Sequence, residues 1–250
     1  MIKILQNAAA KCLVPVLMAV LWQFLSMYLN KPTVLPRLDQ VGLILLQPTE
    51  RILGTGSLLQ NTLISLARVL LGFVFATAIS MPLGLLMGYF STVERLLDSF
   101  IEMLRPIPPL AWVPLILAWF GIKGLTDFFP SLASNTILAG IQFSTIMIIF
   151  IGVFFPVLIN TVQGVKGIPE EYKESARTLG AGNFSLLTKV VIPAALPMII
   201  TGLRIGLGIG WMCLVAAEMM PGSSCGLGYQ IWYAYELLRA DVIVAGMAVT

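Results

Sequence analysis

Charged side chains gather in one polar stretch, residues 168–193, between two long apolar segments. Pro169 suits the first turn of a helix, where its missing N–H costs nothing. Glu170 and Glu171 follow in that turn, where the helix dipole favours acidic side chains. The stretch is therefore expected to present a charged helix outside the membrane.

Three residues of this helix have the spacing of a single face. Tyr172, Ala176 and Leu179 recur at i, i+4 and i+7, so we expect them to share one narrow face. Glu174 and Arg177 can pair locally or across an interface.

A turn and a second short helix are expected to follow. Gly180 can end the first helix in a left-handed turn, and Gly182 keeps the next link flexible. Asn183 is expected to cap a helix over residues 184–191 that ends before Pro193.

The composition gives no support to catalysis or metal binding in this chain. There is no histidine, which excludes Ser–His and Cys–His catalysis and histidine metal ligands. Cys12, Cys213 and Cys225 lie too far apart for zinc spacing. The chain also lacks the Gly-x4-Gly-Lys-Ser/Thr phosphate loop and cannot bind and split ATP by that route.

The polar stretch resembles the EAA loop of ABC-importer permeases, whose pattern is E-A-A-x3-G-x9-I-x-L-P. The match begins at Glu174 and includes Gly180 and Pro193, while Ser175, Val190 and Ile192 replace the Ala, Ile and Leu of the pattern. The chain as a whole is similar to the permeases of nitrate, sulfonate, taurine and bicarbonate importers. Stretches that support this resemblance are residues 94–98, 117–122, 156–161 and 202–218.

The resemblance implies a type I ABC-importer permease-like bundle of about six transmembrane helices in a bacterial-type inner membrane. It also implies a separate cytoplasmic ATPase that binds ATP and Mg²⁺, an outer substrate-binding protein, a small anion as substrate, and a homodimer of this chain. The ATPase-docking residues would then be Glu170, Glu171, Tyr172, Glu174, Ser175, Ala176, Arg177, Leu179 and Gly180.

Hydrophobic residues make up 58% of the chain and charged residues 11%, against about 25% charged in soluble domains. The sequence therefore predicts an all-α polytopic membrane protein, with lipid as a constant partner. The net charge of +3 is spread over several loops, so no nucleic-acid patch is expected. The segments between spans fall alternately on the two sides of the membrane. The side that holds the N-terminus and residues 165–193 has more Lys and Arg than the other, which favours a cytoplasmic location for that side.

We expect one permease domain over residues 1–250, with a core over 60–250 and a coupling loop over 165–193. An outer helix is expected over 38–46, a charged turn over 94–105, an inserted helix over 128–142 and an interfacial helix over 231–238. The prolines after Arg105 exclude a straight helix over the whole third span, so the span is either broken there or its helix begins after residue 109. The predicted spans are 12–29, 66–89, 103–120, 144–162 and 194–220, with a sixth beginning at Asp241.

Small residues recur every fourth position in two spans. Gly202, Gly206 and Gly210 give the strongest predicted helix contact. A similar stripe in the second predicted span consists of Ser80, Gly84 and Gly88. We expect both stripes to pack against other helices and not against lipid.

Three polar residues within the spans could line a substrate path. Arg68 could attract an anion, meet the outer binding protein or reach the lipid head groups. Glu218 is an odd ligand for an anion, so we expect it at a gate or a helix end, paired or at the rim. Trp211 could line the path, although packing is the simpler interpretation.

Two other classes of protein remain open from the residues alone. An ion-coupled secondary transporter would need buried acids or paired charges near the middle of the membrane. Between Glu102 and Glu170 the sequence has only Asp127, which is expected in a loop. A membrane anchor without transport activity is the other alternative, and the broken third span argues mildly against it.

Overall fold

The computed structural model describes residues 2–128, 137, 140–220 and 222–250. Within them the chain is helical, and extended pairing is limited to the isolated bridges Arg51–Ser57 and Gly124–Gln142. The predicted all-α class is confirmed. The chain forms two compact units, Met1–Leu63 with Ser223–Thr250, and Ile64–Gly222.

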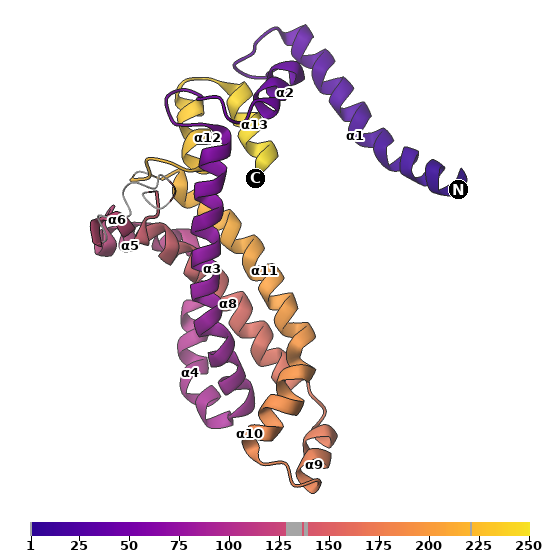
Figure 1. The fold of residues 1–250 in the computed structure, drawn as a ribbon, viewed down its shortest axis with the longest axis vertical. Helices are drawn as coiled ribbons and strands as arrows, with labels where there is room; N and C mark the ends of the chain where they lie inside the picture. The colour runs from indigo at the N-terminus through magenta and orange to yellow at the C-terminus, as the bar shows by residue number, and fades with distance from the viewer. Residues whose placement is uncertain (1, 129–136, 138–139, 221) are drawn as a thin grey trace. The chain divides into compact units, whose positions relative to one another are not determined.

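The second unit contains α3 from residue 64 onward and the helices that follow it as far as α11 (Figure 1). They are α3 (Leu58–Tyr89), α4 (Ser91–Leu104), a 3₁₀ turn (Pro109–Trp112), α5 (Val113–Phe120), α6 (Leu125–Phe128), α8 (Phe143–Lys166), α9 (Glu170–Thr178), α10 (Asn183–Leu186), a π-helical turn (Leu187–Val191) and α11 (Ile192–Glu218). The predicted inserted helix over 128–142 falls mostly outside the described residues.

Three helices in the described ranges are long and apolar enough to cross a membrane: Leu58–Tyr89, Phe143–Lys166 and Asn183–Glu218. A fourth crossing is obtained if α4 and the segment Pro109–Phe120 count as one broken span. Shorter apolar helices over Leu13–Leu29 and Ala240–Val249 correspond to the first and sixth predicted spans.

Helix α8 packs between α3 and α11. A buried cluster joins Val69 and Ala76 of α3, Val153 of α8 and Leu214 of α11. On the α3 side, a Cβ placed on Gly84 would lie 2.7 Å from Cβ of Thr161 in α8. The predicted stripe of small residues on α3 therefore faces α8.

The predicted charged turn is wrong, because residues 91–104 form the helix α4. Val93, Leu97 and Ile101 lie one turn apart and pack beside Leu158 of α8. The third span therefore does not start at residue 103. Instead, the axis bends by 84° between α4 and the segment Pro109–Phe120, as the prolines at 106, 108 and 109 require.

The first unit contains α1 (Ile2–Leu29), α2 (Leu38–Leu46), α12 (Leu227–Glu236) and α13 (Ala240–Val249). Helix α2 has the predicted bounds, whereas α12 begins before the predicted residue 231. The side chain of Gln23 accepts a hydrogen bond from the Leu38 amide at 2.9 Å. Asn61 accepts one from the Gly226 amide at 2.9 Å, which holds the start of α12.

Candidate functional site: the α9 loop and the buried charges of the bundle

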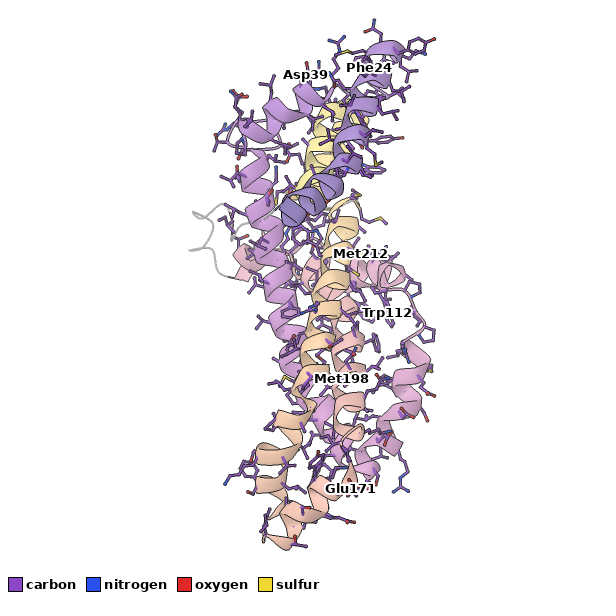
Figure 2. All side chains as sticks on the ribbon, turned by 90° about the vertical axis from the view of Figure 1, so that its right-hand side faces the viewer. Phe24, Asp39, Trp112, Glu171, Met198 and Met212 are labelled. Carbon is purple, nitrogen blue, oxygen red and sulfur yellow. The ribbon has the colours of Figure 1, made fainter. Side chains whose placement is uncertain are left out.

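Helix α9 lies at the end of the second unit where α8 ends and α11 begins, and Glu171 projects there (Figure 2). Pro169 precedes the first helical residue, Glu170. Gly180 has φ +83°, and the Ala181 amide donates to the Ala176 carbonyl at 3.0 Å. The left-handed turn predicted at Gly180 is present, and it lets the chain leave the helix sharply.

Apolar side chains are exposed around this turn. The exposed fractions are 63% for Tyr172, 89% for Leu179 and 80% for Phe184. Ala176 instead packs against the buried cluster that includes Leu186. Of the three residues expected to share a docking face, only Ala176 therefore supports the bundle, while Tyr172 and Leu179 remain accessible. Phe184 was not predicted as an exposed residue of this surface, because the sequence pattern placed it only in a short helix.

The charged groups of α9 are only partly paired with one another. Lys173 donates to Glu170 at 2.8 Å, and this hydrogen bond lowers the pKa of the Glu170 carboxyl. The expected local partner of Glu174 was Arg177, but the two form no ion pair in the structure. Glu171, Glu174, Ser175 and Arg177 are all exposed. The loop therefore presents charges that an approaching protein could pair.

The segment after α9 differs from the prediction in two ways. Gly182, and not Asn183, occupies the N-cap of α10. The helix also does not end before Pro193, because the π-helical turn Leu187–Val191 leads directly into α11. A proline ring normally clashes with the carbonyl four residues earlier, and the wider π turn contains that position.

The glycine face of α11 lies against α8. A Cβ on Gly202 would lie 2.7 Å from Cβ of Asn160, and one on Gly210 would lie 2.7 Å from Cγ2 of Val153. Gly206 is also buried, between Val157 and Val153. The predicted close contact between helices is therefore present, with α8 as the partner.

Arg68 and Glu218 form an ion pair inside the other end of the second unit. Both side chains are 0% exposed, and Arg68 Nη1 lies 2.7 Å from Glu218 Oε1. Arg68 Nε donates to the Gly140 carbonyl at 2.8 Å, and Nη2 donates to the same oxygen. The Ser65 hydroxyl lies 2.8 Å from both carboxylate oxygens.

This network corrects the expectations for the polar residues of the spans. Arg68 does not reach the head groups, because it is fully buried and its donors are engaged. Glu218 is paired and is the last residue of α11, which agrees with the expectation that it lies paired at a helix end. Trp211 packs against the central cluster, and its indole N–H has no partner among the described residues. None of the three lines the cavity beside Arg105 described next.

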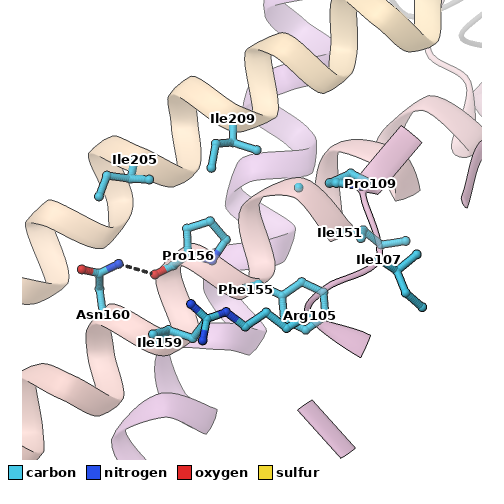
Figure 3. Close-up of a pocket in the computed structure, with 11 residues that line it drawn as sticks. Arg105, Ile107, Pro109, Ile151, Phe155, Pro156, Ile159, Asn160, Ile205 and Ile209 are labelled. Carbon is cyan, nitrogen blue, oxygen red and sulfur yellow. Dashed lines mark hydrogen bonds between the residues drawn. The ribbon is translucent and has the colours of Figure 1, made fainter. Parts of the chain in front are cut away.

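A cavity of about 310 Å³ lies between α8, α11 and the bend after α4 (Figure 3). Isoleucines supply much of its wall, and the polar side chains that line it are Arg105 and Asn160. The Asn160 amide donates to the Pro156 carbonyl at 2.8 Å. The sequence analysis placed Arg105 in a charged turn and at the start of the third span, and this cavity was not predicted. Among the described residues, no group of three or more His, Cys, Asp and Glu could hold a metal ion.

A bundle of apolar helices with an exposed charged helix between two of them places the chain in the class of polytopic membrane proteins. Residues 80–250 match the family model described as the binding-protein-dependent transport system inner membrane component, and the chain belongs to that family. It is an ABC transporter permease of the multi-pass inner-membrane type.

Individual relatives agree with this assignment. The chain is 53% identical over 239 residues to a Methanocaldococcus jannaschii chain assigned as an ABC transporter permease, covering 96% of this chain and 83% of the relative. It is 37% identical to the taurine transport system permease protein of Escherichia coli, with 94% and 78% covered. It is 34% identical to the nitrate import permease protein of a Synechocystis strain, with 90% and 77% covered.

Proposed function

We propose that this chain is the membrane-spanning subunit of an ATP-driven importer of a small anion. Two copies form the pathway, and each receives a cytoplasmic ATPase that binds ATP and Mg²⁺, so this chain itself catalyses no reaction. An outer binding protein delivers the substrate. The N-terminus and α9 face the cytoplasm in this proposal, as the distribution of Lys and Arg favours.

The observation that carries the proposal is the exposed surface around α9. Tyr172, Leu179 and Phe184 are apolar and exposed in a segment that is itself polar and lies between two spans. A cluster of exposed apolar side chains outside the lipid region marks a protein contact. The unpaired charges of Glu174 and Arg177 would orient that partner, because complementary charges fix the register of an interface.

The anionic class of the substrate is supported by the names of the relatives and by the charges of the bundle. A fixed, unpaired acid in a narrow passage of low dielectric would repel an anion. Among the described residues, Glu218 is the carboxylate buried in the bundle, and Arg68 pairs with it. Candidates are nitrate, bicarbonate, taurine and alkanesulfonates. The same pairing leaves Glu218 poorly suited to carry a coupling proton, which disfavours an ion-coupled transporter.

The docking part is tested by replacing Tyr172 and Leu179 together with alanine in the purified complex. Loss of two exposed anchors should weaken ATPase binding by roughly tenfold or more, because aromatic anchors dominate interface energies. The matched control is Met212→Ala, since Met212 is 71% exposed on a span. ATPase binding by the double variant equal to that of the control would contradict the docking role.

The substrate part is tested by uptake into vesicles that contain the complete complex and its binding protein. Labelled taurine, methanesulfonate, nitrate and bicarbonate are compared with a cation and a neutral sugar. ATP-dependent uptake of one of the four anions is expected. Specific uptake of the cation or the sugar would overturn the anion assignment and leave the docking role standing.

A further inference from the structure

The cavity beside Arg105 combines an apolar wall with one cationic side chain. Ile107, Ile151, Phe155, Ile159, Ile205 and Ile209 form most of the wall. The residues come from the bend after α4, from α8 and from α11, so the cavity depends on the relative position of three elements (Figure 3). Its volume of about 310 Å³ falls at the lower end of the range for small-molecule sites, which is ~300–1,000 Å³.

Arg105 lines this cavity from the end of α4. It is the C-cap residue of α4, with φ −54° and ψ −40°, and proline at 106 fixes the next backbone angle. Figure 3 shows its side chain extending past Phe155 toward Ile159. Among the described residues its guanidinium has no ion-pair partner. The contrast with Arg68 is direct, because the donors of Arg68 are engaged by Glu218 and Gly140.

The carboxylates nearest to Arg105 along the chain line a different cavity. A neighbouring space of about 170 Å³ is lined by Glu94, Asp98 and Glu102, together with Lys166 and Arg105 itself. Lys166 pairs with Glu94 there. No carboxylate of the described residues lines the isoleucine-walled cavity. Arg105 therefore lines both an acidic cavity and one in which it is the only charged side chain among the described lining residues.

We propose that the isoleucine-walled cavity is a transient binding site for a small organic anion of the alkanesulfonate type. Arg105 binds the oxygens of the anionic head, since a planar guanidinium offers two parallel donors to an oxyanion. The isoleucines cover the alkyl part, which removes apolar surface from water. An inorganic anion such as nitrate has no alkyl part that could contact the isoleucine wall. This inference rests on the proposed function and narrows it to one substrate class.

The test uses charged thiol reagents on the complete complex, after Cys12, Cys213 and Cys225 have been replaced with alanine. Ile205→Cys places a reactive thiol in the cavity wall. Its labelling by 2-sulfonatoethyl methanethiosulfonate, which carries an alkanesulfonate, is compared with labelling by the trimethylammonioethyl analogue. We expect the anionic reagent to be favoured, and Arg105→Gln to lower that preference by roughly tenfold through loss of the nearby charge.

Two further variants test whether the reagent preference depends on the charge of Arg105 and not on a change in folding. Arg105→Lys keeps a positive charge and should retain most of the preference, whereas Arg95→Gln should not change it. Arg95 is the matched control because it lies on the same helix, bonds to the Ser91 carbonyl and does not line this cavity. Ethanesulfonate should protect the thiol from labelling when Arg105 is present and lose this effect with Arg105→Gln. An unchanged reagent preference in Arg105→Gln would overturn the site.

Uptake measurements keep this inference apart from the proposed function. If the complex imports an anion but Arg105→Gln alters neither the labelling preference nor the KM for uptake, the site is wrong and the importer assignment stands. If the complex imports only a cation or a sugar, the proposed function fails, and the alkanesulfonate assignment fails with it. An increase in KM for alkanesulfonates that exceeds the increase for nitrate supports the site.

Discussion

The two ends of the second unit use the same kinds of charged side chain in opposite ways. At one end, Arg68 and Glu218 are fully buried and bonded to each other, to Ser65 and to a backbone carbonyl. At the other end, the charges of α9 are exposed except for that of Lys173, which is 17% exposed and pairs locally with Glu170.

Under the proposed function, this difference separates charges bonded within the fold from charges that a partner protein would bind. A buried ion has lost its water and must be satisfied inside the same chain, so the pair at Arg68 stabilises the fold only while it is complete. Exposed charges keep their hydration and contribute little to folding, so they remain available to a partner. The two ends should therefore respond differently when their charges are removed.

The largest effect is expected at the buried end. Arg68→Met leaves the Glu218 carboxylate buried and unpaired, which should cost about 3–5 kcal/mol. The thermal stability of the purified protein in detergent measures this loss. Arg204→Met is the control, because Arg204 is exposed on the same bundle. Stability of Arg68→Met equal to that of the control would remove the contrast between the two ends.

A double variant sharpens the same point. Arg68→Met combined with Glu218→Leu removes both charges and should recover much of the lost stability, since an apolar pair needs no hydrogen-bond partners. A double variant as unstable as Arg68→Met alone would show that the ion pair itself is not the source of the loss.

An intermediate effect is expected at the contact between α8 and α11, which joins the two ends. Gly206→Leu should overpack the contact with Val157 and Val153 and cost roughly 1–3 kcal/mol. The yield of intact complex after purification measures it. Gly208→Leu is the control, because a Cβ at Gly208 meets no atom within 4 Å. Similar yields for both variants would contradict a close helix contact.

The smallest effect on folding is expected at the exposed end. Gly180→Ala forces a side chain into a left-handed conformation at φ +83°, at a cost of about 1 kcal/mol. We expect little change in stability and a few-fold lower ratio of uptake to ATP hydrolysis. Gly182→Ala has ordinary backbone angles and open space around it, so it is the control. Equal coupling in both variants would exclude a special role for the turn.

The features predicted correctly from the sequence are those that local residue patterns determine. Helix α2, the left-handed turn at Gly180 and the buried glycine face of α11 all depend on residues within a few turns of one another. Helix α4 was missed, although Val93, Leu97 and Ile101 give it a helical apolar period. Its charged residues favoured a turn in the sequence-based prediction.

The remaining features depend on contacts between distant segments. Arg68 and Glu218 are 150 positions apart, and nothing in either neighbourhood indicates that they pair. The position of Arg105 beside the isoleucine wall depends on the 84° bend and on the packing of α8 against α11. The continuation through Pro193 depends on a π-helical turn, which local propensity does not indicate.

That continuation also has a mechanical consequence. Residues Asn183–Glu218 form one helix of 36 residues, about 54 Å long at 1.5 Å per residue. A stiff rod of this length acts as a lever: a small displacement near α9 tilts the whole rod and swings its far end, where Glu218 lies. In the proposed complex the ATPase would push at α9, and the π-helical turn Leu187–Val191 lies close to that point.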